Sequence, residues 1–242
     1  MNVLVIDVGG SHVKIRTSGV AEERKFDSGP DMGPAQMAEG IRKLAAGWRY
    51  QVVAIGYPGV VKNDLPVTEP HNLGRGWVGF DYSRAFGGKP VKMVNDAAMQ
   101  ALGSYDKGTM LFLGLGTGLG SAMVVNGVVL PMELAHLPYR KHSCEYYVGE
   151  DALERLGKKK WRQHVFDVVA RLGAALLPDE VVIGGGNLRL VDELPPRCRR
   201  GDNANAFAGG FRLWSATSRV RATSPQVVAA PGKSASRLRA AR

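Results

Sequence analysis

The chain has 242 residues, 45% of them hydrophobic and 22% charged, a balance typical of a globular protein with ample length for a buried core. No apolar run approaches the ~20 residues needed to cross a bilayer, and the first residues follow a strand pattern rather than that of a signal peptide. We therefore expect a cytoplasmic protein that does not enter membranes. Its two cysteines, Cys144 and Cys198, are expected to be free thiols.

The net charge of +10 is concentrated at one end of the chain. Six basic residues and no acid lie after Trp214, which leaves a net charge of +4 for residues 1–214. The end segment is rich in Ala, Ser, Arg and Pro and contains no aromatic residue. Because it has too little apolar surface to offset its ordering entropy, residues 215–242 are predicted to form a disordered basic tail. Binding of nucleic acid or membranes by this tail is the less favoured alternative.

Strands and helices are predicted to alternate along the rest of the chain. Strands are expected at residues 2–8, 12–17, 22–28, 52–57, 91–95, 110–113, 122–125 and 181–183. Helices are expected where apolar residues recur at helical spacing, at residues 34–48, 97–102, 151–155, 161–177 and 204–213. A loop rich in Pro, Gly and Asn is expected between residues 58 and 79.

This alternation predicts an α/β fold made of two similar lobes. We expect an N-terminal lobe over residues 1–104 and a C-terminal lobe over residues 105–203. A terminal helix over residues 204–214 is expected to pack back on the first lobe.

Two glycine-rich turns, each directly after an apolar strand, are the most informative motifs. The first contains Asp7, Gly9, Gly10 and Ser11, and the second contains Gly116, Thr117 and Gly118. Glycine allows backbone N–H groups to face an anion, so both turns are suited to phosphate. Asp7 could hold Mg²⁺ through water, and Lys14 could add a positive charge. An ordinary tight hairpin is an equally weighted alternative for the first turn.

Three further motifs each have a functional and a structural interpretation. Asn95 and Asp96 could place a carboxylate at the mouth of a sheet, or simply cap a helix. Glu133, His136 and Glu145 could bind a hydroxyl-rich ligand; a zinc site is poorly supported because the cysteines are not clustered. The turn Gly184-Gly185-Gly186 is compatible with a nucleoside or with a plain connection. Neither a dinucleotide fingerprint nor a P-loop has the required glycine spacing.

Taken in order, these motifs resemble those of the ROK sugar kinases, members of the actin/hexokinase/Hsp70 superfamily. The resemblance runs from about residue 2 to Trp214 and is closest to the short bacterial branch that includes polyphosphate glucokinases. It implies a two-lobed actin/hexokinase-like (ribonuclease H-like) fold of mixed sheets flanked by helices, with a ligand cleft between the lobes. It also implies a homodimer, no structural zinc, and Mg²⁺ as cofactor.

The resemblance further implies a role for each motif in a hexose kinase, most simply a glucokinase. Asp96 would be the general base for the 6-hydroxyl of the sugar, and it would bind the sugar together with Asn72, Asn95, Glu133, His136 and Glu145. The phosphoryl donor, ATP or polyphosphate, would contact Asp7, Gly9, Gly10, Ser11, Lys14, Gly116, Thr117, Gly118, Gly184, Gly185 and Gly186. Asp7 would also hold Mg²⁺.

Two positions depart from the family pattern and leave a second function open. Ala135 stands where glycine is usual, which would strain the backbone by roughly 1 kcal/mol if a positive φ is needed there. Ala98 stands where Asn or Asp is frequent. The alternative is a catalytically weak sugar-binding or sugar-sensing protein, although only six residues precede Asp7, so no DNA-binding domain is expected.

The donor stays open between ATP and polyphosphate. A long polyanion would favour a basic track, and candidates for it are Lys158, Lys159, Lys160, Arg162, Arg197, Arg199 and Arg200. The alternative is that these residues form a solvated helix face and a basic loop.

Overall fold

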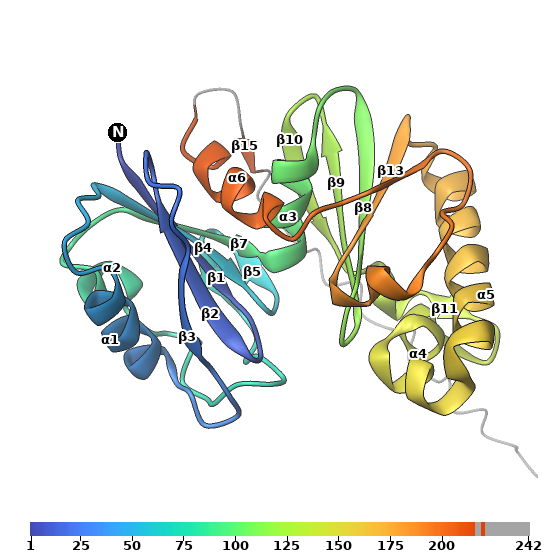
Figure 1. Ribbon diagram of the computed structural model, residues 1–242, viewed down its shortest axis with the longest axis horizontal. Coiled ribbons are helices and arrows are strands. Elements are labelled where there is room, and N and C mark those ends of the chain that lie inside the picture. Colours follow the sequence, from blue (N-terminus) through green and yellow to red (C-terminus); the bar gives the residue numbers. More distant parts are fainter. Residues whose placement is uncertain (216–218, 221–242) are drawn as a thin grey trace, which may run out of the picture.

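The computed structural model of the protein describes residues 1–215 and 219–220. Two mixed β-sheets lie with helices between them and on both outer faces, so that five layers follow one another across the molecule (Figure 1). The predicted tail lies outside the described residues except for Ser215 and for Arg219–Val220, the short strand β15. No helix in the described part of the chain is long and apolar enough to span a membrane.

The first sheet has the strand order β3-β2-β1-β4-β7. Its strands are β1 (Val3–Val8), β2 (His12–Thr17), β3 (Arg24–Asp27), β4 (Val52–Tyr57) and β7 (Val91–Asn95). The first three pair antiparallel, whereas β1, β4 and β7 pair parallel. Helices α1 (Pro34–Leu44) and α2 (Tyr82–Ala85) lie on its outer side (Figure 1).

The second sheet repeats this arrangement with the order β14-β13-β8-β9-β10-β15. Its strands are β8 (Thr109–Leu115), β9 (Leu119–Val125), β10 (Val128–Met132), β13 (Glu180–Gly184), β14 (Cys198–Arg200) and β15. Again a three-stranded antiparallel meander continues into two parallel strands. Helices α4 (Cys144–Val148) and α5 (Glu150–Leu176) lie on the outer side. The similarity of the two halves predicted from the sequence is therefore present in the strand order.

The inner layer consists of α3 (Asp96–Ser104) and α6 (Asn205–Arg212). Each helix follows the last parallel strand of one sheet and packs against the other sheet: α3 contacts β8, β9 and β10, and α6 contacts β1 and β4. The two helices also approach each other closely. A methyl group at Gly103 would collide with the Asn205 carbonyl oxygen, and one at Gly209 would collide with that of Met99.

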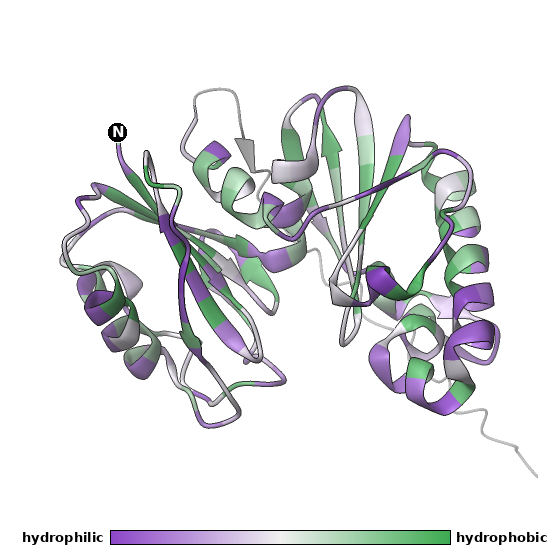
Figure 2. Cartoon of the chain, viewed as in Figure 1, coloured by the Kyte–Doolittle hydropathy of each residue, from purple (hydrophilic) through white to green (hydrophobic). Residues whose placement is uncertain are grey.

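Alternating side chains explain why the strands are apolar on both faces. In β1, Val3 and Val5 belong to the inner core with α3 and α6, whereas Leu4 and Ile6 belong to the outer core with α1. A strand covered on both sides buries every residue, as β4 does along its whole length. Figure 2 shows this pattern as largely hydrophobic strands beside helices that also carry hydrophilic residues.

Several elements differ from the sequence prediction. The helix expected over 34–48 ends at Leu44. The two helices expected within 151–177 are present as the two parts of α5, which is interrupted at Gly157 with φ 76°. The predicted loop 58–79 contains a small hairpin, β5 (Val61–Lys62) and β6 (Leu65–Pro66). The short elements that were not predicted are α2, β10, η1 (Leu134–His136), β11 (Pro138–Tyr139), β12 (His142–Ser143), α4, η2 (Gly186–Leu190), β14 and β15.

Candidate active site

The first glycine turn joins β1 to β2 and is held from two directions. Its Gly9 N–H donates to the His12 carbonyl at 3.0 Å, which closes the turn. Ser28, after β3, donates its hydroxyl to the Gly9 carbonyl at 2.7 Å, and its N–H donates to the Ser11 carbonyl at 3.0 Å. Ser28 is a supporting residue that the sequence pattern did not indicate, because it follows a different strand.

Asp7 and Lys14 face each other across this hairpin. They are directly paired in the β1–β2 register, so their side chains lie on the same face of the sheet. Burial raises the pKa of Asp7 to about 6, while the positive charge of Lys14 opposes that rise and Glu23 adds to it. The predicted phosphate turn therefore carries a poorly solvated carboxylate beside a lysine.

Asn95 is the helix cap considered from the sequence, and Asp96 is the carboxylate at the end of the strand. The Asn95 Oδ1 accepts from the N–H groups of Ala97 and Ala98 at 2.9 and 3.4 Å, so Asn95 caps α3. Its Nδ2 donates to the Gly59 carbonyl at 3.1 Å, which leaves one N–H available to a ligand. Asp96 begins the helix and accepts from the Ala97 N–H at 2.7 Å.

Asp96 lies near charged groups from both halves of the molecule. Its pKa is raised to about 7, chiefly by burial and also by the negative charges of Asp7, from the first sheet, and Glu133, after the second, while a hydrogen bond from the Ala97 N–H lowers it. The adjacent Ala97 packs against Gly120 in β9, where a methyl group would lie 2.9 Å from the Ala97 Cβ. A carboxylate whose pKa is near neutral pH is suited to accept a proton.

The second and third glycine turns form one continuous surface at the ends of β8 and β13. A methyl group at Gly185 would collide with the backbone of Leu115, and the Asn187 Nδ2 donates to the Gly116 carbonyl at 3.2 Å. Gly184 lies next to α3, because a methyl group there would be 3.6 Å from Gln100 Oε1. Asn187, which directly follows the third turn, thus joins the two turns, and Gln100 is a further neighbour that the sequence analysis missed.

Glu133, His136 and Glu145 gather beside the second turn. Burial raises the pKa of Glu133, the positive charge of His136 opposes this rise, and the negative charge of Glu145 adds to it. Ser121 positions this segment: its hydroxyl donates to the Met132 carbonyl at 2.9 Å and accepts from the Leu134 N–H at 3.1 Å. The Glu145 Oε2 accepts from the Leu119 N–H at 3.2 Å.

Asn72 lies at the first turn. Its side chain is exposed, and a methyl group at Gly10 would lie 3.2 Å from the Asn72 Cβ. The structure thus places Asn72, predicted to contact sugar, next to a glycine predicted to contact the donor.

The two departures from the family pattern do not distort the backbone. Ala135 is buried in η1 and is not among the residues with positive φ, so the strain considered from the sequence is absent. Ala98 is fully buried in α3 and belongs to the inner core.

The residues present fit a magnesium ion at Asp7. A buried carboxylate with a raised pKa lacks solvation for its charge, and a cation would supply it. Mg²⁺ is commonly held by one or two carboxylates together with the phosphates of the substrate. Elsewhere, the described residues contain no group of three or more His, Cys, Asp or Glu side chains arranged to hold a metal ion.

Most of the basic residues considered as a polyphosphate track are engaged in structural contacts. Arg162 and Lys158 pair with Asp192. Arg199 pairs with Glu180 at 2.7 Å, and Arg200 donates to carbonyls of Leu188, Val191 and Asp192 at the end of η2. Lys159 and Lys160 are exposed on α5.

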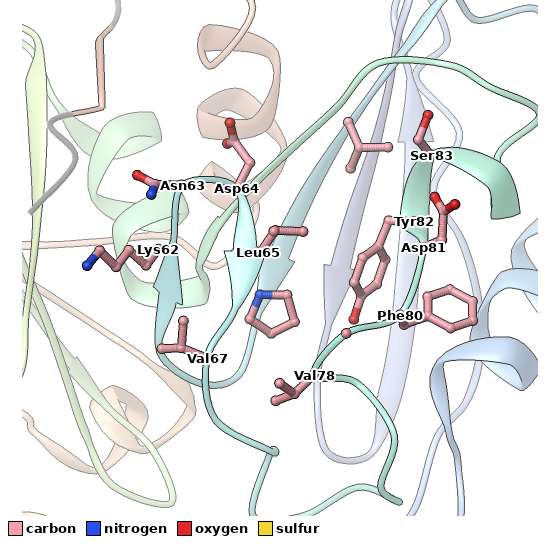
Figure 3. A pocket seen from close by; sticks show the side chains of 13 residues that line it. Lys62, Asn63, Asp64, Leu65, Val67, Val78, Phe80, Asp81, Tyr82 and Ser83 are labelled. Atoms are coloured by element: carbon pink, nitrogen blue, oxygen red, sulfur yellow. The ribbon is translucent and has the colours of Figure 1, made fainter.

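A pocket of about 840 Å³ lies beside the β5–β6 hairpin (Figure 3). Figure 3 shows Leu65, Val67 and Val78 at its wall, with the ring of Tyr82 facing them. None of the predicted site residues lines it. The candidate site is therefore defined by the three turns and the carboxylates, not by this pocket.

Comparison with known proteins supports the resemblance that the motifs carry. The chain is 28% identical over 218 residues to polyphosphate glucokinase from Mycobacterium tuberculosis, covering 79% of this chain and 80% of that protein. No family model matches it.

Two solved structures share its fold. Inorganic polyphosphate/ATP-glucomannokinase from Arthrobacter sp. strain KM superposes with a TM-score of 0.74 at 23% identity, over 86% of this chain and 96% of that one. A ROK family glucokinase from Streptomyces griseus, solved with glucose and AMPPNP, superposes with a TM-score of 0.68 at 15% identity, over 87% and 98%. The predicted ROK resemblance and two-sheet fold are confirmed, and the chain is related to sugar phosphotransferases.

Proposed function

We propose that this chain, whose motifs, fold and relatives are those of the ROK sugar kinases, is a hexose kinase with glucose as the favoured sugar. It would transfer a phosphoryl group from ATP or polyphosphate to the 6-hydroxyl. The observation that carries this proposal is the position of Asp96 at the start of α3, close enough to Asp7 of the first half and Glu133 of the second for both charges to raise its pKa, which is about 7.

In the proposed reaction Asp96 accepts the proton of the sugar hydroxyl as that oxygen attacks the terminal phosphorus. The bond from this phosphorus to the bridging oxygen of the donor breaks, and the shortened donor leaves with the electron pair. Glu133, His136 and Glu145 hold the other hydroxyl groups and so orient the sugar, which is the main requirement of phosphoryl transfer.

The donor side is assigned to the three glycine turns. Backbone N–H groups of the first and second turns would face the phosphates, and Lys14 would add a positive charge. Asp7 would hold Mg²⁺, which supplies neutralisation of phosphate charge when bound. The third turn, Gly184–Gly186, would border the nucleoside when ATP is the donor.

Both donors remain part of the proposal. Polyphosphate as a donor is supported by the similarity to a polyphosphate glucokinase and to a polyphosphate/ATP-glucomannokinase, and the second of these also supports ATP. Against a long basic track, Lys158, Arg162 and Arg199 are paired with acids. We also propose a homodimer in the cytoplasm, as expected from the sequence.

A matrix of donors and sugars tests the proposal. Purified chain is incubated with Mg²⁺ and either ATP or polyphosphate, against glucose, mannose and N-acetylmannosamine, and sugar phosphate is measured. We expect turnover with glucose and at least one donor. Binding of glucose without turnover in any combination would support the alternative, a sugar-binding or sugar-sensing protein. If glucose is neither bound nor phosphorylated, the kinase and the sugar-binding alternative are both contradicted.

A further inference from the structure

Glu145 lies near both the sugar-binding and the donor-binding residues of the proposed site. Its negative charge raises the pKa of Glu133, which we assign to the sugar, and its Oε2 accepts from the Leu119 N–H directly after the second glycine turn. The contact with the turn is tight, because a methyl group at Gly118 would collide with Glu145 Oε2. One side chain therefore contacts the donor turn and lies close enough to Glu133 for their charges to interact.

The elbow between α4 and α5 holds the same turn through its backbone. The Glu150 N–H donates to the Thr117 carbonyl at 3.0 Å, and Gly149 packs so closely that a methyl group there would be 2.8 Å from that oxygen. Gly149 in turn donates to the Glu145 carbonyl at 2.8 Å. The position of α4, from which Glu145 projects, is thus linked to the shape of residues 116–119.

We propose that Glu145 is a positioning residue that couples sugar binding to donor binding, an inference that rests on the proposed function. A sugar hydroxyl donating to Glu145 would fix its carboxylate on the Leu119 N–H. The turn would then already be ordered when the phosphates arrive. Because coupling between two ligands is reciprocal, the donor must raise sugar affinity by the same factor.

The coupling is measured as the ratio of donor dissociation constants without and with saturating sugar, by calorimetry in the presence of Mg²⁺. AMPPNP is titrated with and without glucose. Polyphosphate is titrated with and without 6-deoxyglucose, which lacks the accepting hydroxyl and so prevents transfer during the experiment. For the wild type we expect sugar to tighten binding of at least one donor by about fivefold or more, within the usual range of coupling factors.

Two variants break the link from opposite sides. Glu145→Ala removes the carboxylate, and Gly118→Ala adds a methyl group that displaces it from Leu119 while leaving it in the chain. In both variants, the ratio of donor dissociation constants without and with sugar should fall to between about 0.5 and 2, which means that the coupling is lost. Gly118→Ala keeps the test valid where Glu145→Ala binds sugar too weakly to saturate.

Matched controls separate the link from general damage. Gly173→Ala adds a methyl group on α5 that meets no atom within 4 Å and lies outside the proposed site, so its coupling ratio should match the wild type. Glu154→Gln removes a carboxylate from an exposed position on α5 and should also keep the ratio.

The outcomes distinguish this inference from the proposed function. A wild-type ratio near one, or an unchanged ratio in Gly118→Ala, would overturn the role of Glu145 while glucose phosphorylation still upheld the kinase. Absence of both sugar and donor binding in the wild type would overturn the kinase, and with it this inference.

Discussion

Asp7 and Asp96 are close enough that the charge of Asp7 contributes to raising the pKa of Asp96. Their pKa values of about 6 and about 7 lie above the ordinary value of 3.8, chiefly because burial removes water from the charged form. Because a buried charge destabilises the folded state, these two aspartates lower the stability of the protein when they are ionised. A catalytic function explains why two apolar strand ends would carry it.

The raised pKa values of Asp7 and Asp96 make the free energy of unfolding depend on pH. Between about pH 4 and pH 7 the folded chain binds more protons at Asp7 and Asp96 than the unfolded chain does. Their contribution to the free energy of unfolding therefore decreases as pH rises through this window, and the loss is nearly complete by about pH 8.

Asp96→Asn removes one of the two charges and should raise the melting temperature at pH 8 by several degrees. At pH 4 to 5, where Asp96 is protonated in the folded chain, the difference should be small. Thermal unfolding of both proteins across this range measures it, with Asp31→Asn as an exposed control. A variant that melts at or below the wild-type temperature at pH 8 would contradict the burial of this charge.

At the scale of elements, α3 and α6 are held together by glycines. Gly103 and Gly209 each face a carbonyl oxygen of the other helix, and Gly210 packs on Val5 in β1. Since Asp96 begins α3, the contact between these helices also fixes where the proposed base lies.

Gly209→Ala should push the two helices apart and destabilise the protein by ~1–3 kcal/mol, the usual cost of overpacking. Chemical denaturation measures this loss. Gly173→Ala in α5 is the matched control, because its methyl group meets no atom within 4 Å and alanine favours a helix interior by about 0.5–1 kcal/mol. Equal stability of both variants would show that the α3–α6 contact is loose.

Elements with a strong local signal were predictable from sequence, and those shaped by distant contacts were not. Strands β1, β2 and β4 are apolar runs beside turn residues, and each was predicted within a residue or so. Short pieces such as α4 and β14 contain too few residues for a periodic pattern. The interruption of α5 was predictable, because Gly157, which has a positive φ, lies between the two helices expected from the sequence.

The same distinction holds for the site. The glycine turns and Asn95-Asp96 were visible because each follows a strand within a few residues. The contacts of Glu145 with Leu119 and of Asn187 with Gly116 were not, because they join residues 26 and 71 positions apart. Asn72 was assigned to the sugar through the family resemblance, but only the structure places it at Gly10.

Across the whole molecule, the two sheets follow the same plan, and their turns occupy equivalent places. The first turn joins β1 to β2, and the second joins β8 to β9. Each of the helices α3 and α6 follows a strand of one sheet and packs on the other sheet. Asp96, at the start of α3 directly after β7, is therefore brought close to β9 of the other half. A duplicated half therefore explains how residues so far apart in sequence contribute to one site.

Phosphorylation of a hexose with Asp96 as the general base is the reaction that we propose for this site. It is tested by steady-state phosphorylation of glucose by Asp96→Asn and by the wild type, with glucose binding measured for both. We predict that kcat falls by ~10²–10⁴-fold, as expected for loss of a positioned base, while glucose binding persists. A variant that keeps more than about half of the wild-type kcat would contradict this proposal and leave Asp96 only a structural role at the start of α3.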